Sequence, residues 1–403
     1  MNNDLKNERS LDYLRKQTWW CPRLFDHIYT NTTGEYTVCC VGGSNKETVS
    51  NTDPLDWYFG NVYQSCRRAA LGLGDDKDKK ILEHQCQRCI EQEKTHGNSE
   101  RIQLSNKIND IDEVIKITND FYRNGKPSLR QNGLILQFRQ FGTTCNLDCY
   151  MCHPFNSSVR EKTSRENNYY ELVSFEKPQP FKGGENQNRF LDNIEKIIPY
   201  TRIIVLQGGE PFLLKKQFEY LDKVIESDWG GEDIILEMNS NLTILGSGNK
   251  SILDYIKHFE FLQINISLDG FGKYNDYIRR RSFWKDIMYN YNLLKEYENV
   301  HMQVFSTVSL LSILRFKELE KWCNENNLDQ RLYVVDDPKE LHPKNLPDKI
   351  KNKLMPMYIN NEIVYNSLLL DRNEDEYNKA IQYIRKTDEL YKTNLFEIYP
   401  ELA

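Results

Sequence analysis

Apolar residues gather in short blocks from residue 134 onward, and the blocks alternate between two spacings. Runs rich in β-branched and aromatic residues predict strands, and the segments between them show the spacing of amphipathic helices. The predicted strands are Leu134–Phe141, Ile203–Gln207, Ile234–Met238, Leu262–Leu268, Met302–Val308 and Leu332–Val335. The predicted helices are Arg189–Ile198, Lys215–Glu226, Ile252–His258, Phe283–Tyr297 and Phe316–Asn326. This alternation predicts an α/β fold with a parallel sheet and right-handed crossovers.

The alternation yields six strand–helix units, fewer than the eight of a complete barrel, so we expect a partial, open (β/α)6 barrel. Residues 134–340 form this predicted barrel. Residues 1–100 carry six of the ten cysteines and form a small α+β module. Residues 101–133 are polar and act as a connector. Residues 341–403 form a C-terminal helical extension that packs on the outside of the barrel.

Composition excludes several classes of function. The net charge of −6 gives no support to a nucleic-acid surface. No apolar stretch approaches the roughly 20 residues that cross a bilayer, and the first ten residues lack the apolar core of a signal peptide. We therefore expect a cytoplasmic protein that binds neither nucleic acid nor membrane. In a reducing compartment, clustered cysteines more often hold metal than form disulfides.

Three cysteines follow the first predicted strand directly. Cys145, Cys149 and Cys152 stand at a C-x3-C-x2-C spacing, in a loop where parallel sheets place their chemistry. Each iron of a cubane cluster takes a thiolate, so three local cysteines leave one iron open to a small molecule. A structural zinc site is the alternative, but such sites close with four ligands. His153 is too near Cys152 in sequence to join it easily.

This loop resembles the motif of the radical S-adenosylmethionine (SAM) superfamily. Met151 takes the position where the family often has an aromatic residue, and it is a suitable apolar substitute beside an adenine. The resemblance implies that Cys145, Cys149 and Cys152 bind a [4Fe–4S] cluster whose fourth iron is chelated by SAM. One electron would then cleave SAM to a 5′-deoxyadenosyl radical. The protein's part is positioning, tuning and exclusion of water.

The second predicted strand ends in Gly208-Gly209-Glu210. Glycines let the backbone approach a ligand closely, and a carboxylate accepts hydrogen bonds from an ammonium group. A turn with a helix-capping acid explains the tripeptide about as well when it is considered alone. After the cysteine loop, however, it resembles the GGE motif of the family. The resemblance implies that Gly208, Gly209 and Glu210 hold the methionyl amine of SAM.

Polar clusters also follow the next two strands. Asn239 lies in Asn-Ser-Asn, and Ser267 and Asp269 lie in Ser-Leu-Asp-Gly. Asx and Ser turns are the alternative explanation of both. By resemblance, these residues would contact the ribose and carboxylate of SAM. Arg279 would meet the SAM carboxylate through a charge-assisted contact, although it stands in a run of three arginines.

A second group of cysteines lies in the first hundred residues. Cys21 precedes Gly34, which follows Asn-Thr-Thr and predicts a hairpin turn. The hairpin would bring Cys39 near Cys21. Cys86 and Cys89 form a C-x2-C pair at the end of a helical stretch and would complete a four-thiolate cage.

This order of residues resembles the auxiliary-cluster module of SPASM and twitch radical SAM enzymes, except that the module here precedes the barrel. The resemblance implies one auxiliary [4Fe–4S] cluster on Cys21, Cys39, Cys86 and Cys89. A four-cysteine zinc ribbon is the alternative. Cys40 adjoins Cys39 and is an alternative ligand; Cys39 satisfies the glycine spacing.

The resulting hypothesis is a radical SAM enzyme that abstracts hydrogen from an unidentified substrate, with an auxiliary cluster that accepts the substrate's electron. The substrate is a small molecule or a peptide. A reductase or a ferredoxin- or flavodoxin-type protein would supply the electron. Two alternatives stay open. One is a radical SAM enzyme of peptide or protein maturation, and the other is a non-catalytic iron–sulfur or zinc protein that binds ligands or transfers electrons.

Overall fold

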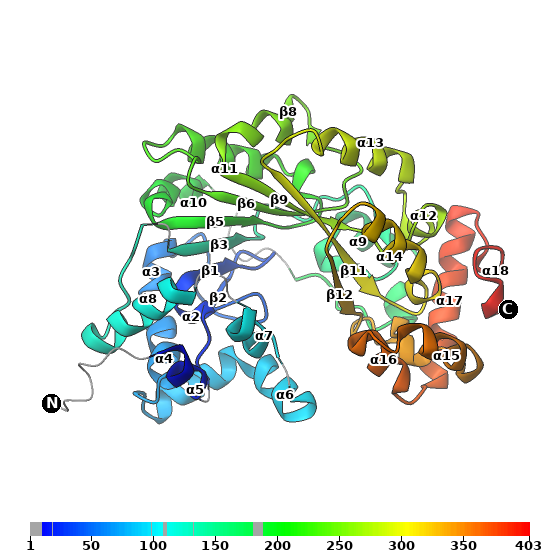
Figure 1. Cartoon of the computed structure of the whole chain (residues 1–403), viewed down its shortest axis with the longest axis horizontal. Coiled ribbons are helices and arrows are strands. Elements are labelled where there is room, and N and C mark those ends of the chain that lie inside the picture. Colours follow the sequence, from blue (N-terminus) through cyan, green and yellow to red (C-terminus); the bar gives the residue numbers. More distant parts are fainter. Residues whose placement is uncertain (1–9, 18, 98, 108–110, 132, 180–187) are drawn as a thin grey trace.

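The computed structural model describes residues 10–403 except 18, 98, 108–110, 132 and 180–187. Its strands are β1 (His27–Thr30), β2 (Tyr36–Thr37), β3 (Leu134–Phe138), β4 (Asp148–Cys149), β5 (Thr201–Leu206), β6 (Ile235–Ser240), β7 (Gly246–Ser247), β8 (Lys250–Ser251), β9 (Phe261–Ser267), β10 (Arg279–Arg280), β11 (Val300–Val308) and β12 (Gln330–Val334). An 8-stranded sheet, in the order β12-β11-β9-β6-β5-β3-β1-β2, forms the centre of the molecule (Figure 1).

Helices surround this sheet. Those before β3 are α1 (Leu11–Arg15), α2 (Arg23–Asp26), α3 (Pro54–Tyr58), α4 (Asn61–Ala70), α5 (Asp76–Gln85), α6 (Gln87–His96), α7 (Glu100–Lys107) and α8 (Ile111–Asn124). Those between the barrel strands are α9 (Ser158–Glu166), α10 (Asn188–Asn193), α11 (Lys215–Glu226), α12 (Lys273–Ile278), α13 (Trp284–Leu294) and α14 (Phe316–Glu325). The C-terminal helices are α15 (Asp348–Leu354), α16 (Glu362–Leu369), α17 (Glu374–Tyr391) and α18 (Leu395–Ile398).

Six strands of this sheet lie side by side in the order in which they follow one another in the chain: β3, β5, β6, β9, β11 and β12. Each runs parallel to its neighbours. Right-handed crossovers between successive parallel strands place their helices on one face of the sheet. The other face is left concave, as in a barrel that does not close. The predicted partial (β/α)6 barrel is therefore confirmed, with all six predicted strands present.

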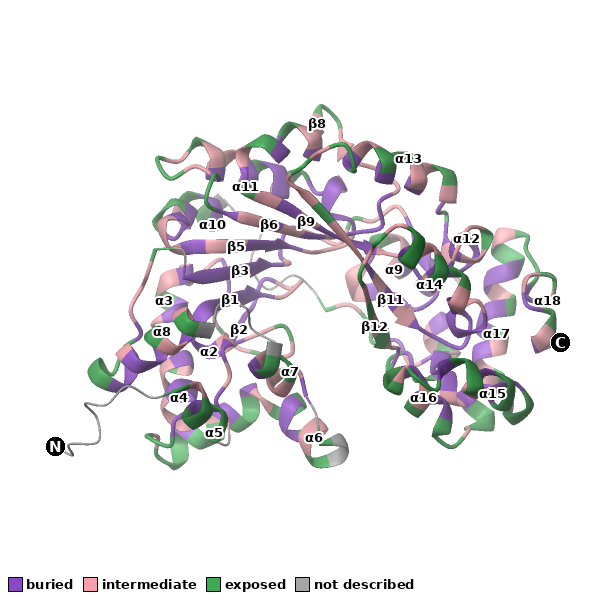
Figure 2. Cartoon of the chain, viewed as in Figure 1, coloured by how far each residue is buried: buried purple, intermediate pink, exposed green. Residues whose placement is uncertain are grey.

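The two faces of the sheet differ in how far their side chains are buried. In β6, β9 and β11, the residues that point toward the helices are buried, and most of those that point into the concave face are only half-buried (Figure 2). Successive side chains of a strand point to opposite faces. Those that are buried against the helices are mainly aliphatic and include Leu236, Ile264 and Val304. The concave face is thus the accessible one.

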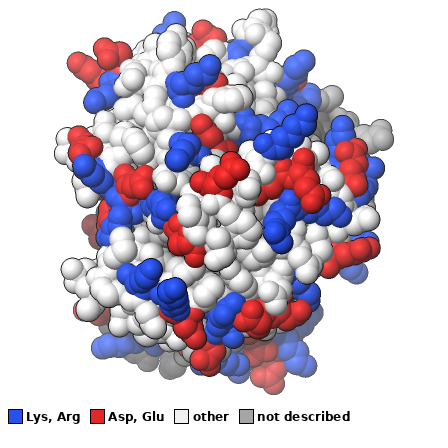
Figure 3. Space-filling view, turned by 90° about the vertical axis from the view of Figure 1, so that its right-hand side faces the viewer, with Lys and Arg blue, Asp and Glu red and all other residues white. Residues whose placement is uncertain are grey.

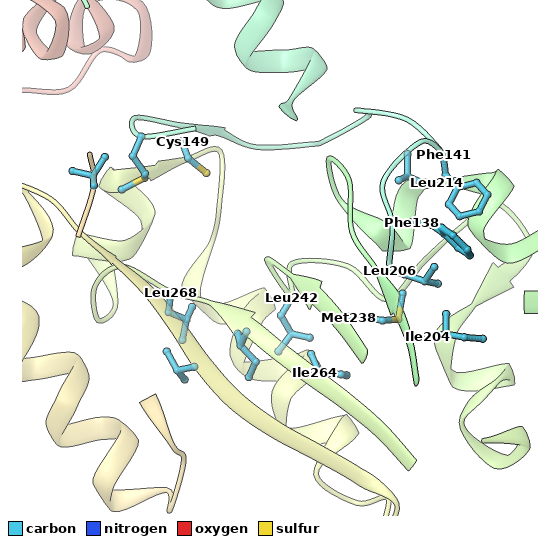
Figure 4. Packing of buried hydrophobic residues seen from close by; sticks show 14 of the residues in the cluster. Phe138, Phe141, Cys149, Ile204, Leu206, Leu214, Met238, Leu242, Ile264 and Leu268 are labelled. Atoms are coloured by element: carbon cyan, nitrogen blue, oxygen red, sulfur yellow. The ribbon is translucent and has the colours of Figure 1, made fainter. Parts of the chain in front are cut away.

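The core is densest where β3 and β5 end. Phe138, Phe141, Leu206 and Leu214 are buried together there (Figure 4). The ring of Phe141 stacks on Tyr220 of α11 at a centroid distance of 5.6 Å. Aromatic packing of this kind contributes beyond area burial alone. It gives a rigid base to the loop that leaves β3.

The N-terminal segment extends the barrel sheet. The predicted hairpin is confirmed, because β1 pairs antiparallel with β2 around Gly34, which has a φ of 81°. Sequence reasoning did not foresee that β1 also pairs in parallel with β3, from His27 opposite Ile135 to Thr30 opposite Phe138. The cysteines of the hairpin are thereby brought to the edge of the barrel.

Three predicted elements differ from the structure in detail. The first barrel strand ends at Phe138, because the following residues leave the sheet to form the cysteine loop. The predicted helix Ile252–His258 is two 3-10 turns, Ile252–Asp254 and Ile256–His258. The predicted helix Arg189–Ile198 is α10 followed by 3-10 turns at Ile194–Lys196 and Ile198–Tyr200. Short segments between strands lack room for regular α-helices.

The C-terminal extension is helical, as predicted. On the molecular face turned to the viewer in Figure 3, acidic and basic side chains are interspersed. None of the helices that the structure describes is long and apolar enough to cross a membrane.

Candidate active site

The three-cysteine loop crosses the carboxyl end of the sheet. It leaves β3, forms the two-residue strand β4 that contains Cys149, and continues into a 3-10 turn at Pro154–Asn156. Strand β4 pairs antiparallel with β10, which sets Cys149 opposite Arg279. The amide of Tyr150 adds a hydrogen bond of 3.1 Å to the carbonyl of Ile278. The loop is therefore held as a small second sheet.

The three thiols lie close enough to perturb one another. Burial, with smaller effects from Glu210 and Cys152, raises the pKa of Cys145 to about 12. Burial also raises the pKa of Cys149, with Cys152 and Cys145 adding to the rise and Arg279 opposing it. Such thiols stay neutral in the absence of an electrophile, and metal coordination is what converts buried thiols to thiolates.

The donor set suits a soft metal cluster, since one short loop carries three thiols and Cys149 lies beside the cation Arg279. Within the described part of the chain, no three His, Cys, Asp or Glu side chains are already placed to hold a metal ion. Loading a cluster would therefore require the thiols to turn toward a common point. A rotation about χ1 is a small change for a cysteine on a loop whose backbone is fixed.

The Gly208-Gly209-Glu210 turn lies directly against this loop. A Cβ on Gly209 would stand 2.2 Å from the carbonyl oxygen of Thr144. The amide of Glu210 donates a hydrogen bond of 2.8 Å to the same oxygen. The glycine that sequence reasoning assigned to a ligand is thus required by the approach of the cysteine loop itself. Any larger residue at position 209 would displace the loop.

The Glu210 carboxylate is buried and engaged within the protein. It accepts hydrogen bonds from the hydroxyl of Ser240 and the amide of Asn241, both at 2.8 Å, and from the amide of Phe212 at 3.3 Å. Burial raises the pKa of Glu210 to about 7 against these stabilising contacts. The turn therefore joins the ends of β5 and β6 to the cysteine loop.

The three neighbouring arginines have different surroundings. Arg279 forms an ion pair of 2.7 Å with Asp269, and its guanidinium lies 4.0 Å from the sulfur of Cys149. Arg280 is buried against Asp388, and Arg281 is exposed. Arg279 is therefore the arginine of the run that stands beside the three-cysteine thiols.

Asp269, the ion-pair partner of Arg279, is itself held in place by the protein. It is fully buried, and its second oxygen accepts a hydrogen bond of 2.7 Å from the amide of Thr307. Both carboxylate oxygens are thus engaged by the protein. Ser267 is half-buried at the end of β9, and Met151 is buried next to Cys152.

A row of polar side chains crosses the concave face of the sheet. Asn265 is buried, and its amide group donates to Glu237 and to Asn239, both at 2.7 Å. Gln303 in turn donates a hydrogen bond of 2.6 Å to the Asn265 carbonyl. Complete barrels usually fill this space with branched aliphatic side chains. A polar row in its place offers hydrogen-bonding groups to a ligand.

Sequence reasoning identified Asn239 in this row and missed Asn265 and Gln303. The signal was present, because polar residues alternate with aliphatic ones along β6, β9 and β11. It was overlooked because each residue alone resembles an ordinary exposed strand position.

The second cysteine group assembles at the start of the chain. Cys86 lies between α5 and α6, Cys89 lies in α6, and Cys21 precedes α2. Burial is the largest cause of a raised pKa at each thiol. Cys66, Cys39, Cys21 and Cys89 each add to the rise at Cys86. Electrostatic coupling thus links the four predicted cysteines, and it also includes Cys66, which sequence reasoning left out of the group.

Cys39 and Cys40 have different electrostatic neighbours. The pKa of Cys39 is raised by burial and by Cys40, Cys21 and Cys89. The pKa of Cys40 is raised by burial and by Glu100, and it is lowered by Arg23 and Arg139. Of the two, Cys39 is the one with Cys21 and Cys89 among its neighbours.

A family match covers the segment that carries this site. Residues 140–314 match the family model of the radical SAM superfamily. The chain contains a radical SAM domain. The matched segment holds the three-cysteine loop, Gly208–Glu210, the polar row and Arg279.

Solved structures with a similar fold include native anSMEcpe with bound AdoMet, at a TM-score of 0.40 and 14% identity over 59% of this chain. The chain spans 62% of the length of that protein. Another is Streptococcus suis SuiB bound to S-adenosylmethionine, at a TM-score of 0.35 and 12% identity, with coverage of 85% of this chain and 67% of that one. No curated protein matches the chain.

Helix α17, outside the matched segment, is joined to that segment by a group of buried side chains that we call the C-terminal network: Asp148, Arg160, Arg280, Tyr383 and Asp388. Arg160 of α9 forms an ion pair of 2.7 Å with Asp148 in the cysteine loop, and both side chains are fully buried. Arg160 also donates a hydrogen bond of 2.8 Å to Tyr383 of α17. Tyr383 in turn donates to the carbonyl of Tyr150 at 2.9 Å.

A second ion pair links the same helix to the other side of the loop. Arg280 contacts Asp388 of α17 at 2.5 Å and donates to the Tyr150 hydroxyl at 2.7 Å. Its guanidinium lies 3.9 Å from the ring centroid of Tyr277, a cation–π contact. Helix α17 therefore supports both strands of the small sheet that carries Cys149. Sequence reasoning missed this, since no local pattern signals such distant pairs.

Proposed function

We propose that the protein is a radical SAM enzyme that cleaves SAM reductively and takes a hydrogen atom from a substrate carbon. The observation that carries this proposal is the set of three mutually interacting thiols, with the buried Cys149 beside Arg279, in a radical SAM domain. A bound [4Fe–4S] cluster with SAM would supply one electron to form a 5′-deoxyadenosyl radical. Cys145, Cys149 and Cys152 would hold that cluster.

The surrounding residues would bind and orient SAM. Arg279 would pair with the SAM carboxylate, and its ion pair with Asp269 fixes its direction. The backbone of Gly208 and Gly209 would receive the methionyl amine, while Glu210 holds the turn in place. Asn239 and Ser267 would contact the ribose, and Met151 would pack near the adenine.

The second cysteine group would hold an auxiliary [4Fe–4S] cluster. Cys21, Cys39, Cys86 and Cys89 supply four thiols, which complete the ligand set of a cubane. With no iron left open, its role would be to accept the electron of the substrate radical. A zinc ion on the same four cysteines is the alternative.

The substrate would meet the polar row on the concave face. Glu237 and Gln303 present acceptors and Asn239 an amide there, a set that suits a substrate with several hydrogen-bonding groups. Small molecules and peptides both meet this description, so peptide maturation remains the alternative reaction class. A reductase or a ferredoxin- or flavodoxin-type protein would deliver the electron.

Anaerobic reconstitution with iron and sulfide tests the proposal. About eight irons per chain are expected if both sites hold cubanes, against about four irons and one zinc for the ribbon alternative. The reduced protein with SAM should release 5′-deoxyadenosine.

The variant Cys149→Ala should abolish that release and keep the N-terminal metal. Cys323→Ala, which removes a buried thiol of α14 that belongs to neither group, is the matched control. Release of 5′-deoxyadenosine by Cys149→Ala would overturn the assignment. Iron without any SAM cleavage would favour the non-catalytic alternative.

A further inference from the structure

The cysteine loop and the loop that follows β6 are joined by a closed ring of side-chain hydrogen bonds. The side-chain amide of Asn146, the residue after Cys145, donates to the hydroxyl of Thr243 at 2.7 Å. That hydroxyl donates to the side-chain oxygen of Asn241 at 2.6 Å. The side-chain amide of Asn241 closes the ring by donating to the side-chain oxygen of Asn146 at 3.0 Å. We call Asn146, Asn241 and Thr243 the amide ring.

The backbone of the loop after β6 is bent so that this ring can close. Leu242, between two members of the ring, is fully buried and has a left-handed φ of 56°. Residues other than glycine rarely adopt this conformation, and they keep it only where their surroundings impose it. The hydroxyl of Ser240 accepts from the Leu242 amide, and the side chain of Asn290 of α13 donates to the Leu242 carbonyl, both at 2.9 Å. This turn lets the residues on either side of Leu242 meet the same side chain of the cysteine loop.

The amide ring contacts two parts of the proposed SAM site. The backbone amide of Asn241 donates a hydrogen bond of 2.8 Å to the carboxylate of Glu210, in the turn proposed to receive the methionyl amine. Asn146 lies in the bend where the amide of Leu147 donates to the sulfur of Cys145 at 3.4 Å. An N–H group directed at a sulfur favours the thiolate and orients it. The ring therefore links a proposed cluster ligand to the Glu210 turn.

We propose that the three residues of the amide ring are positioning residues that set the direction of the Cys145 sulfur relative to the Glu210 turn, and so align SAM with the cluster. The inference rests on the proposed function, because it requires a cluster on the cysteine loop and SAM at Gly208–Glu210. Opening the ring should weaken the binding of SAM and leave the three cysteines able to hold iron. A ring that served only stability would leave the affinity for SAM unchanged.

The hydroxyl of Thr243 gives the sharpest test, since it both accepts and donates in the ring. Thr243→Val replaces the hydroxyl by a methyl group, and Thr243→Ser keeps the hydroxyl. In 5′-deoxyadenosine release by the iron-loaded protein, the KM for SAM should rise about tenfold in Thr243→Val, with a smaller change in kcat. Thr243→Ser should stay within about twofold of the wild type. Iron content should be the same in all three proteins.

A second measurement needs neither iron nor SAM. In the metal-free protein, hydrogen exchange at the Leu147 amide should be faster in Thr243→Val than in the wild type, and Thr243→Ser should restore the slow exchange. Asn146→Ala opens the ring from the other loop and should have both effects of Thr243→Val, so it decides the matter if Thr243→Val does not fold. Asn366→Ala, at an exposed position of α16, is the control and should change neither exchange nor KM.

An unchanged KM for SAM in Thr243→Val would overturn the inference, even if exchange at Leu147 became faster. A raised KM that Thr243→Ser does not restore would overturn it too, because the hydroxyl would then not be the cause. Loss of iron from Thr243→Val would show that the ring holds the ligands themselves. These three outcomes leave the proposed function intact. A wild-type protein that binds iron and releases no 5′-deoxyadenosine would refute the proposed function and, with it, the alignment of SAM.

Discussion

The two cysteine groups are built in opposite ways. The three-cysteine loop is short and is held by the Gly209 turn, by β10, by an ion pair to Arg160 of α9 and, through Arg280 of β10, by an ion pair to α17. The N-terminal group collects thiols from residue 21 to residue 89, mostly at the ends of short helices and after a two-residue strand. One site has a backbone fixed by local contacts, whereas the other draws together distant parts of the chain.

Under the proposed function, this difference follows from the number of cysteines that bind each cluster: three in the loop and four in the N-terminal group. A cluster with one open iron must present that iron in a fixed direction, so the protein has to supply the rigidity. A cluster with four thiolates is closed, and metal binding itself can organise distant ligands. Buried ion pairs are weak evidence for stability, but they are well suited to fixing a geometry. Their concentration around Cys149 is consistent with that role.

The largest expected effect distinguishes two adjacent thiols of the N-terminal group. Cys39→Ala should remove the auxiliary cluster, a loss of about four irons per chain. Cys40→Ala should keep it, because Cys21 and Cys89 are neighbours of Cys39, whereas the charged neighbours of Cys40 are Glu100, Arg23 and Arg139. Iron and zinc analysis of the two reconstituted variants provides the measurement. Loss of metal from Cys40→Ala alone would reverse the assignment, and equal loss from both would show that the two thiols exchange.

The second-largest expected effect is a loss of stability when the C-terminal network is broken. Asp388→Asn leaves Arg280 buried without its carboxylate partner, which should cost about 3–5 kcal/mol. The lost ion pair lies beside the three-cysteine loop, so less iron should bind at that loop while the auxiliary cluster persists. Thermal unfolding and iron content measure the two consequences. Asp375→Asn, at an exposed position of the same helix, is the control. A uniform loss from both clusters would show that α17 supports the whole molecule and not this loop.

The sequence predicted the parts of this molecule that depend on neighbouring residues. The alternation of apolar runs gave the barrel strands, and the spacing of Cys145, Cys149 and Cys152 gave the loop at the end of β3. Gly34 gave the hairpin. Each of these signals is local, since it depends on strand propensity, turn geometry or ligand spacing within a few residues.

The parts that escaped prediction depend on tertiary contacts. Nothing near Asp148 indicates that Arg160 and Tyr391 will meet it. The pairing of β1 with β3 joins segments separated by most of the N-terminal module. The close approach of the Thr144 carbonyl to Gly209 also escaped prediction, since sequence reasoning considered only a ligand at that glycine. Long-range packing determines these features, and a single sequence carries no pattern for it.

The smallest expected effect is a dependence on pH at His342, beside the C-terminal helices. Burial lowers the pKa of His342 to about 4 from its usual 6.5, partly opposed by Asp336 and Glu376. Below pH 6.5 the unfolded chain therefore binds a proton that the folded protein resists. Stability should fall as the pH decreases from about 6.5 to 4, by at most about 3 kcal/mol.

Replacing this imidazole should flatten that dependence. His342→Asn retains an acceptor for the amide of Lys344 and removes the titrating ring. Hydrogen exchange at pH 7 and pH 5 should show that acid opens α15 and α17 in the wild-type protein more than in the variant. Exchange in α5 and α6, which carry the second thiol group, should differ little between the two proteins. His301→Asn, at an exposed site of β11, should behave like the wild type. If acid opened α5 and α6 through the same histidine, the two cysteine groups would share one cooperative unit, and the contrast between them would not hold.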